Sequence, residues 1–334
     1  MGNITIKKLA LELNLSTATV SRALRDSHEI SFETKQKVLA LAKKHNFEPN
    51  PSASNLRSHK SKTIAVIVPE IANNFFSQAI NGIEEVARKL GYHVLIYQTH
   101  ENSETEIAFT SRLLNGRVDG ILISVASETN DNRHFEDIIG QLPLVFFDRV
   151  CEDIEAVKIT TDDYDSTYEA TLHLVACNCK RIAYLAALNN LSTGKKRIAG
   201  YLDALRDNHI PIDEALILYA GNSEEENYKR IKKLLMDEKP DGIIASIEEL
   251  ALPVYYACKD LHLEIPNDVK IISFSNLKTA PLLNPSLTTI TQPAFEIGKE
   301  AANILFKILN KKDVDPNEII VLKSTLIKRE STAC

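Results

Sequence analysis

The sequence predicts an α/β protein with an N-terminal three-helix head and a larger two-lobed domain built on parallel sheets. Two observations carry this prediction. From residue 63 onward, β-branched runs alternate with helical patterns, which is typical of parallel strands joined by crossover helices. Residues 1–62 hold 11 Lys or Arg against 5 Asp or Glu, net +6, whereas residues 63–334 hold 28 against 40, net −12. A polyanion should therefore be attracted to the N-terminal end and repelled by the rest.

Residues 4–25, ITIKKLALELNLSTATVSRALR, have the pattern of a helix-turn-helix. The apolar residues Leu9, Ala10 and Leu13 give the first helix a stripe that can be buried. Asn14 tolerates the left-handed backbone that a tight turn needs. Ser16 is the expected N-cap of the second helix.

The second of these helices has two distinct faces. Val20 and Leu24 lie at i and i+4 on the side expected to be buried, whereas Ala18, Arg22 and Arg25 lie on another face. That outer face could enter a major groove of DNA. The alternative is an ordinary amphipathic helical hairpin, but the basic charge of this end of the chain favours nucleic-acid binding.

A third helix and a linker complete this end of the chain. Ser31 is the expected N-cap of a helix that runs to about His45, which places a helix-turn-helix domain at residues 1–46. Residues 47–62 contain two prolines and four serines and are expected to form a hinge. Within it, residues 51–57 could form a short helix with proline at its first position.

Residues 63–334 are long for one sheet, so two lobes are expected. Lobe 1 should cover about residues 63–160 plus 292–320, and lobe 2 about residues 161–291 plus the C-terminal end. The expected strands are 64–69, 93–97, 120–124, 144–148 and 157–160 in one set and 181–188, 216–220, 242–246 and 269–275 in the other. The expected helices include 76–90, 194–208, 224–238, 249–261 and 292–311, followed by one strand-like segment, 319–331.

Open α/β sheets bind ligands at the carboxyl ends of their strands, and two facing lobes form a cleft that can close on a small molecule. The candidate pocket residues are those just past strand ends, namely Asn74, Phe75, Phe76, Asp148, Arg149, Glu248 and Ser275. Two alternatives stay open here. Phe75 and Phe76 could instead pack in the core or between the lobes, and Asp148 could pair with Arg149 or another cation in a structural role.

The helix expected after residue 248 has an unusual start. Ser246 and Glu249 have the spacing of a capping box, in which each side chain bonds a backbone N–H of the other end of the turn. Pro253 removes a backbone donor within the first two turns. The entrance to this helix is therefore expected to be reshaped.

The sequence gives little support for an enzyme. No two of its 11 glycines stand as G-x-G, and residues 192–196, STGKK, lack both the upstream glycine and the final Ser or Thr of a phosphate-binding loop. Cys177 and Cys179 have no second cysteine pair, and the nine histidines show no ligand spacing. We therefore expect no cofactor, no metal site and packed, reduced thiols, and no set of Ser, His and an acid stands out in the sequence.

The ends of the sequence favour a cytoplasmic protein. No charged-then-apolar leader opens it, and no apolar run approaches the ~18 residues of a membrane span, so no membrane partner is expected. A secreted two-lobed sugar-binding protein is the main structural rival, but it would carry a signal sequence and no basic helical head. An enzyme of the Rossmann class is a more distant alternative.

The order and spacing of several motifs resemble the LacI/GalR (lactose-repressor) family of bacterial transcription regulators over essentially the whole chain. The matching motifs are TATVSRAL, EPNPSASNLR, KTIAVIVP, NNFF, GYHVLI, RVDGILI, FFDR, RIAGYLDAL and NPSLTTITQP. The resemblance implies a two-lobed, periplasmic-binding-protein-like effector domain. It also implies a homodimer that binds a palindromic operator in double-stranded DNA. Because no terminal heptad run follows, a dimer is favoured over a tetramer.

The resemblance also implies roles for individual residues of the head and hinge. Base edges would be faced by Thr17, Ala18 and Arg22. Phosphates would be contacted by Thr5, Ser16, Ser21 and Asn50. Arg22 is the best candidate for sequence readout, because a guanidinium can bond two acceptors of a guanine at once.

The hinge and two departures from the family complete the expected DNA interface. Leu56 occupies the position of a wedge in the minor groove, with Ala53 packed nearby, although packing of Leu56 on its own domain is the alternative. Asn14 replaces the usual turn glycine. Arg25 replaces a common asparagine and can add a phosphate or base contact.

In the cleft, the resemblance implies that Arg197 reaches the effector, with a carbohydrate as the leading class and a nucleobase next. Ile247 and Glu248 stand where relatives have Asn-Asp, and Ser275 stands where they have Asp, so no specific ligand is transferred. The resulting interpretation is a repressor controlled by a small effector. An activator, or a regulator that needs a corepressor such as a nucleobase, is the alternative.

Overall fold

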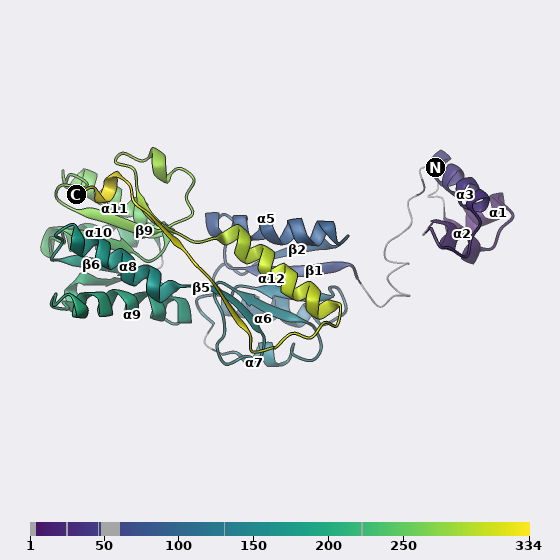
Figure 1. The fold of residues 1–334 in the computed structure, drawn as a ribbon, viewed down its shortest axis with the longest axis horizontal. Helices are drawn as coiled ribbons and strands as arrows, with labels where there is room; N and C mark the ends of the chain where they lie inside the picture. Colours follow the sequence, from purple (N-terminus) through teal and green to yellow (C-terminus); the bar gives the residue numbers. More distant parts are fainter. Residues whose placement is uncertain (1–4, 25, 46, 48–60, 130, 222) are drawn as a thin grey trace. The chain divides into compact units, whose positions relative to one another are not determined.

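A computed structural model describes residues 5–24, 26–45, 47, 61–129, 131–221 and 223–334 (Figure 1). The chain divides into two compact units, residues 1–61 and 62–334. The first unit contains three helices, α1 (Ile6–Glu12), α2 (Thr17–Leu24) and α3 (Phe32–Lys44). We call its described part, residues 5–47 without 25 and 46, the head.

A small apolar core joins the three helices of the head. Leu9 from α1, Val20 from α2 and Val38 from α3 are each completely buried in it. Phe47, the first residue of the expected hinge, packs against the same core, and its N–H donates to the carbonyl of Ala42 at 2.8 Å. The head therefore extends to Phe47.

The turn and caps of the head confirm the expected local chemistry. Asn14 has a φ of 52°, in the left-handed region. The hydroxyl of Ser16 accepts from the N–H of Thr19 at 3.0 Å, and that of Ser31 accepts from the N–H of Thr34 at 3.4 Å. Each hydroxyl satisfies a backbone donor that the helix itself leaves without a partner.

Lobe 1 of the second unit is a six-stranded sheet whose strands are all parallel, in the order β11-β5-β4-β3-β1-β2. Its strands are β1 (Thr63–Val68), β2 (His93–Gln98), β3 (Gly120–Ile123), β4 (Leu144–Phe147), β5 (Val157–Thr161) and β11 (Ile319–Leu322). Its helices are α5 (Asn74–Lys89), α6 (Ser103–Leu113), α7 (Arg133–Glu136) and α12 (Ala294–Leu309). Central strands such as β3 are buried on both faces, which explains their unbroken apolar runs.

Lobe 2 repeats this plan in the order β12-β10-β9-β8-β6-β7, and only β12 runs antiparallel to its neighbour. Its strands are β6 (Ile182–Ala186), β7 (Ile217–Tyr219), β8 (Gly242–Ala245), β9 (Lys270–Phe274), β10 (Thr288–Thr291) and β12 (Thr325–Ile327). Its helices are α8 (Asp163–Ala176), α9 (Ser192–Asp207), α10 (Glu224–Asp237) and α11 (Ala251–Asp260). Strand β10 has no counterpart among the strands expected from the sequence.

Helices α5 and α12, which are far apart in the sequence, lie side by side on lobe 1 (Figure 1). Two glycines make this approach possible. A Cβ atom on Gly82 would lie 2.1 Å from the carbonyl oxygen of Phe295, and one on Gly298 would lie 1.9 Å from that of Ala79. Any side chain at either position would force the helices apart.

The chain passes between the lobes three times, after β5, after β10 and after β11. The last passage corrects one expectation. Residues 319–331 are not one strand: Ile319–Leu322 pairs with β5 in lobe 1, whereas Thr325–Ile327 pairs with β10 in lobe 2. The apolar pattern is continuous because both halves are strands, but the chain passes from the lobe 1 sheet to the lobe 2 sheet at Lys323 and Ser324.

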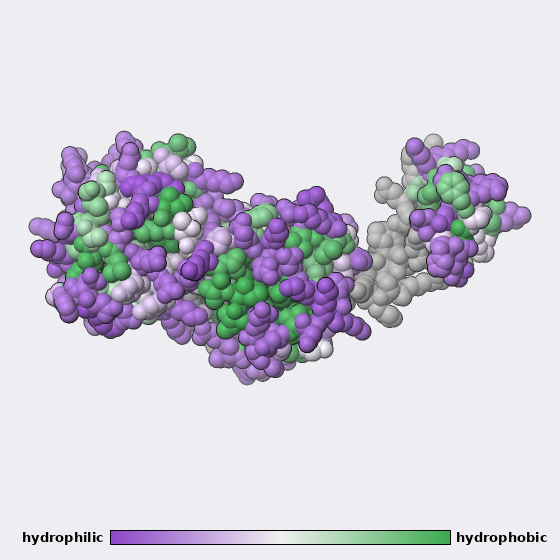
Figure 2. All heavy atoms as spheres, in the orientation of Figure 1, coloured by the Kyte–Doolittle hydropathy of each residue, from purple (hydrophilic) through white to green (hydrophobic). Residues whose placement is uncertain are grey.

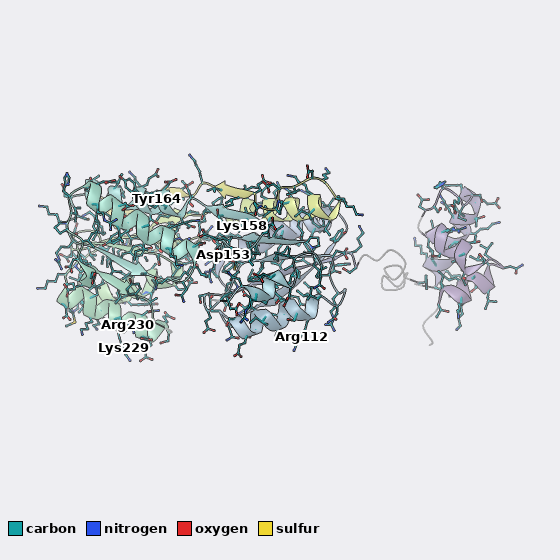
Figure 3. The ribbon with its side chains drawn as sticks, turned by 90° about the horizontal axis from the view of Figure 1, so that it is seen from below. Arg112, Asp153, Lys158, Tyr164, Lys229 and Arg230 are labelled. Carbon is teal, nitrogen blue, oxygen red and sulfur yellow. A yellow bond between two sulfur atoms is a disulfide. The ribbon has the colours of Figure 1, made fainter. Side chains whose placement is uncertain are left out.

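Lobe 1 also contains a buried lysine on β5 (Figure 3). The Nζ of Lys158 donates to the carbonyl oxygens of Ile154 at 2.6 Å and Ala156 at 3.0 Å. Burial lowers the pKa of this lysine, because removal from water disfavours the ammonium form. Its two carbonyl partners fix the loop between β4 and β5.

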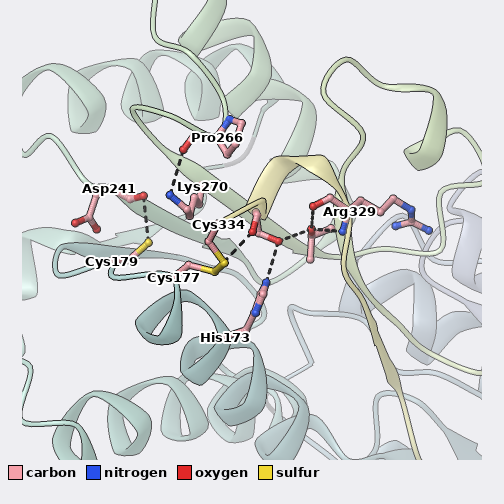
Figure 4. The surroundings of a disulfide bond; sticks show 10 residues. His173, Cys177, Cys179, Asp241, Pro266, Lys270, Arg329 and Cys334 are labelled. Carbon is pink, nitrogen blue, oxygen red and sulfur yellow. Dashed lines mark hydrogen bonds between the residues drawn. A yellow bond between two sulfur atoms is a disulfide. The ribbon is translucent and has the colours of Figure 1, made fainter.

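A disulfide contradicts the expectation that the thiols are all reduced. Cys177, at the C-terminal end of α8, is bonded to Cys334 (Figure 4). Next to it, the hydroxyl of Thr332 bonds to His173 at 3.0 Å and to Thr288 at 2.7 Å. The pairing was missed because its partners are 157 residues apart in the sequence. Three cysteines are free and buried: Cys151, Cys179 and Cys258.

Among the described residues, no helix combines the length and the apolar character required to cross a membrane.

Candidate DNA-binding face and interlobe cavity

The head exposes the face of α2 that the sequence predicts to meet DNA. Thr17 and Ala18 are exposed, and the side chain of Arg22 is 54% exposed, whereas Val20 and Ala23 on the opposite side are buried. This division follows from the amphipathic spacing of the helix.

The other predicted DNA contacts divide into two groups. Thr5, which precedes α1, and Ser16 are exposed, and Ser21 is partly buried. Four lie outside the described residues: Arg25, Asn50, Ala53 and Leu56. The predicted hinge helix, residues 51–57, lies there as well.

One head residue near this face was not selected from the sequence. The carboxylate of Glu29 lies 3.3 Å from the Nε of Arg22. Seven positions separate the two residues in the chain, and Glu29 belongs to the turn between α2 and α3. Because Glu29 lies beyond the end of α2, the periodicity of the helix does not indicate this contact.

A small cavity, partly open to solvent, lies between the lobes of the second unit. It is lined by Asn73, Phe75, Phe76, Asp148, Arg149, Leu188, Thr193, Arg197, Ile247, Glu248, Glu249, Phe274, Ser275, Asn276 and Gln292. The structure thus brings together all the candidate pocket residues except Asn74, which contacts the lining residue Glu248.

Asp148 and Arg149 follow β4 and form the lobe 1 wall. Asp148 is buried with a φ of 61°, and burial raises the pKa of its carboxyl group to about 6. The guanidinium of Arg149 donates from Nη1 to both oxygens of Glu101, at 2.8 Å each, and lies over the ring of Phe76. Its Nε is buried and, among the described residues, has no hydrogen-bond partner. A buried N–H of this kind is available to an acceptor atom of a ligand.

The structure shows the contacts on which the two alternatives left open by the sequence depend. Arg149 makes its short ion pair with Glu101, whereas its Nε is 3.9 Å from Asp148. Phe75 and Phe76 belong to the apolar core under α5 and also line the cavity. The two phenylalanines are therefore core residues that also line the cleft.

Arg197 on α9 forms the centre of the lobe 2 wall. Its Nε donates to Asp163 at 2.8 Å, its Nη1 donates to the carbonyl of Ser246 at 2.5 Å, and its guanidinium lies 3.7 Å from the ring centre of Phe274. Both charged side chains of the pair are 4% exposed. A buried charge is tolerated only with such compensation.

Two hydrogen bonds connect the lobes at the mouth of the cavity. The amide of Asn74 donates to Glu248 at 2.5 Å, and the amide of Asn73 donates to Glu249 at 2.6 Å. The second oxygen of Glu248 accepts from the Ser275 hydroxyl at 2.8 Å.

The expected capping box at Ser246 and Glu249 is wrong. The hydroxyl of Ser246 accepts from the N–H of Ala187 at 2.9 Å, and Glu249 bonds across to Asn73. A 3₁₀ turn, Glu248–Leu250, precedes α11 and has no side-chain cap. Ser246 and Glu249 thus bond to residues that are distant in the sequence, Ala187 and Asn73, and not to the backbone of their own turn.

Several residues that line the cavity were not selected from the sequence, although the sequence indicates some of them. Gln292 follows β10, which was not expected, and Leu188 follows β6, which ends before the expected residue 188, so the strand-end rule finds both once the strands have their observed bounds. The amide of Gln292 donates to Asp148 at 3.3 Å, from one lobe crossing to the other. Asn73 instead serves as the N-cap of α5, and no strand-end rule indicates its second contact.

Comparison with known proteins identifies both units. Residues 5–50 match the family model described as bacterial regulatory proteins, lacI family. Residues 61–330 match the model described as periplasmic binding proteins and sugar binding domain of LacI family.

Full-length relatives agree with these matches. Catabolite control protein A of Priestia megaterium is 30% identical, over 99% of both chains. The HTH-type transcriptional repressor CytR of Escherichia coli K12 is 31% identical, over 98% of this chain and 96% of CytR.

Solved structures show the same fold. The lac repressor dimer bound to operator and the anti-inducer ONPF has a TM-score of 0.89 and 24% identity, with both chains fully covered. A LacI-type regulator of Alkaliphilus metalliredigens, complexed with D-xylulofuranose, has a TM-score of 0.71 and 29% identity over 82% of this chain and all of that one. The relatives are transcriptional regulators rather than enzymes, and the chain belongs to the LacI family of DNA-binding bacterial transcriptional regulators.

Proposed function

We propose that this protein is a repressor that binds a palindromic operator as a homodimer and releases or holds it according to a small effector, a sugar or sugar derivative, in the interlobe cavity. The observation that carries the proposal is the cavity itself. Its walls come from two lobes that are connected by hydrogen bonds at its mouth, on a chain that also carries an exposed recognition face. A ligand bound there changes the free energy of lobe closure.

The DNA part of the proposal assigns base contacts to Thr17, Ala18 and Arg22. Their exposure on one face of α2 and the net charge of +6 over residues 1–62 support this role. Thr5, Ser16 and Ser21 are proposed phosphate contacts. Because a closed dimer has two-fold symmetry, two such heads require a palindromic site.

The effector part of the proposal follows from polar and aromatic groups that face the cavity. The Nε of Arg149, which has no hydrogen-bond partner among the described residues, offers a donor to an oxygen atom, and Phe76 and Phe274 add apolar area to the lining of the cavity. The LacI-type regulator from Alkaliphilus metalliredigens, whose structure contains D-xylulofuranose, supports the same ligand class. Glu248 is engaged by Asn74 and Ser275, so an effector that bonds Glu248 must replace these contacts.

The homodimer is supported by apolar side chains on the edge strand of lobe 1. Leu95 and Ile96 on β2 are 40% and 43% exposed, on a strand with no further neighbour in its sheet. Figure 2 shows apolar atoms at the surface of the second unit among mostly hydrophilic ones. An edge of this kind is normally covered by a partner.

The test is selection of binding sites from a random duplex pool with the full-length protein at near-physiological salt. Enrichment of a palindrome is the expected result and supplies a probe for an effector screen. If no sequence is enriched, either alone or with pooled sugars and nucleobases present, the proposal is wrong. Operator and effector must also change each other's affinity by the same factor, which titration of each against the other will measure.

A further inference from the structure

The contact between Arg22 and Glu29 is unusual because it places an acid at a face that is proposed to meet a polyanion. The Nε of Arg22 lies 3.3 Å from a carboxylate oxygen of Glu29, and each side chain is 54% exposed. A carboxylate there repels phosphates and weakens all DNA binding. If Glu29 has a function in DNA binding, that function must therefore be something other than raising the affinity for DNA.

The turn that carries Glu29 is fixed to the rest of the head. The N–H of Ser27 donates to the carbonyl of Arg22 at 3.0 Å, and the Ser27 hydroxyl accepts from the N–H of Glu29 at 3.4 Å. Farther along, Lys35 on α3 bonds the carboxylate of Asp26 at 2.6 Å, with its own side chain only 17% exposed. Glu29 is therefore held beside Arg22 by the fold of the turn.

The other acids described in the head pair elsewhere. Glu12 bonds to His45, Asp26 to Lys35, and Glu33 to Lys37. Within the described part of the head, Glu29 is the acid whose ion pair reaches the recognition helix. Its effect should therefore be on the side chain that is expected to read a base.

We infer that Glu29 is a positioning residue that sets the base specificity of Arg22, an inference that rests on the proposed function. A carboxylate at Nε restricts the rotation of the guanidinium, which still carries its two terminal nitrogens. Those nitrogens are the donors that bond the two acceptors of a guanine. Without Glu29, the guanidinium swings more freely and bonds phosphates, which carry no sequence information.

The test compares full-length wild-type protein with Glu29→Gln, Arg22→Ala and the double variant, using duplexes chosen from the random pool. The measured quantity is a discrimination ratio. It is the affinity for the selected duplex divided by that for the duplex in which the base pair read by Arg22 is exchanged. The base pair read by Arg22 is identified as the position of the site at which the Arg22→Ala variant no longer prefers one base pair over the others.

We expect Glu29→Gln to lower the discrimination ratio about 2- to 5-fold, the range of an exposed ion pair. In the Arg22→Ala background, the same change should leave the ratio unaltered. Glu33→Gln is the matched control, because it removes an equal charge from the head without touching Arg22. Both single glutamine variants should bind random duplex more tightly, and only Glu29→Gln should lose discrimination.

The possible failures are distinguishable. If the wild-type protein enriches no sequence, the proposed function fails. If it enriches a site but Glu29→Gln keeps the wild-type ratio, or if Glu33→Gln lowers the ratio equally, the inference about Glu29 is overturned and the proposed function stands. Thermal melting of each variant separates these results from loss of folding, since an altered ratio at an unchanged melting temperature reports positioning alone.

Discussion

The side-chain amide of Asn74 in lobe 1 donates to the carboxylate of Glu248 in lobe 2 at 2.5 Å. Asn74 begins α5, directly after the strand-to-helix connection of lobe 1, and Glu248 begins the 3₁₀ turn after β8. The hydrogen bond thus joins the carboxyl-end loops of two facing sheets. A group that competes for Glu248 acts directly on the closure of the lobes.

Replacing Glu248 with Ala should favour separation of the lobes. A hydrogen bond to a charged group contributes about 1.5 kcal/mol or more, so the closed-to-open ratio should fall about tenfold. The amides of Phe75 and Phe76, which line the cavity from lobe 1, should then exchange hydrogen faster. Hydrogen exchange followed by mass spectrometry measures this, and Glu238→Ala is the control because Glu238 pairs with Arg181 inside lobe 2. Equal exchange in both variants would contradict the closing role.

The buried pair of Arg197 and Asp163 should respond very differently from a surface pair. Arg197→Ala leaves the carboxylate of Asp163 buried without its partner, so we expect a loss of about 3–5 kcal/mol in the free energy of unfolding. Arg206→Ala is the control: its contact with Asp203 at 2.5 Å is exposed and should contribute less than about 1 kcal/mol. Urea unfolding measures both, and similar losses would show that Asp163 is compensated by other groups.

Much of the fold could be predicted from local sequence patterns because helices and parallel strands have distinct apolar periods. The segment 319–331 shows where this stops. Its two strands belong to different sheets, a division that depends on pairing with β5 and β10 rather than on its own residues. The bond between Cys177 and Cys334 is unpredictable for the same reason, since only the folded chain brings its partners together.

The residues that line the cavity were easier to predict from the sequence than the hydrogen bonds between them. The strand-end rule selects Asp148, Glu248 and Ser275 because parallel strands direct their carboxyl ends to one edge. It does not indicate which polar groups pair with one another. Ser246 bonds Ala187 on a neighbouring segment, which replaces the capping contact that its spacing with Glu249 predicts.

The pH dependence of stability should reveal the buried carboxyl group of Asp148. Burial raises its pKa to about 6, above the unfolded value of about 3.9, so the folded state binds the proton more tightly. The resulting penalty is below about 1 kcal/mol near pH 4, grows as pH rises through 6 and is nearly constant above about pH 7. Asp148→Asn removes the penalty and should stabilise the protein at pH 8 by up to about 3 kcal/mol, but by less than about 1 kcal/mol at pH 4.

Asn is a suitable replacement at this position because it also tolerates the left-handed backbone of residue 148. Asp153→Asn is the control, since Asp153 is exposed and its loss should shift stability little at either pH. Unfolding in urea across the pH range gives both curves. A lower stability of Asp148→Asn at pH 8 would show that the ionised carboxylate is stabilised by the nearby arginines.

The disulfide predicts a specific number of reactive thiols. The chain has five cysteines, so the denatured protein should show three thiols without reductant and five after reduction. Cys334→Ser should show four under both conditions and lose about 2–4 kcal/mol of stability. Cys258→Ser, which removes a free cysteine, is the control and should retain the two-thiol difference. Five thiols in wild-type protein without reductant would contradict the bond.

The two edges of the lobe 1 sheet provide a matched test of the homodimer. Ile96 on β2 is 43% exposed and Ile319 on β11 is 58% exposed, so both are isoleucines on edge strands of one sheet. If β2 lies in the dimer interface, Ile96→Glu buries a charge there and should convert the dimer to monomer, because an unpaired buried charge is strongly unfavourable. Ile319→Glu should leave the assembly intact. Sedimentation velocity distinguishes these outcomes, and dissociation by Ile319→Glu instead would move the proposed interface to the opposite edge.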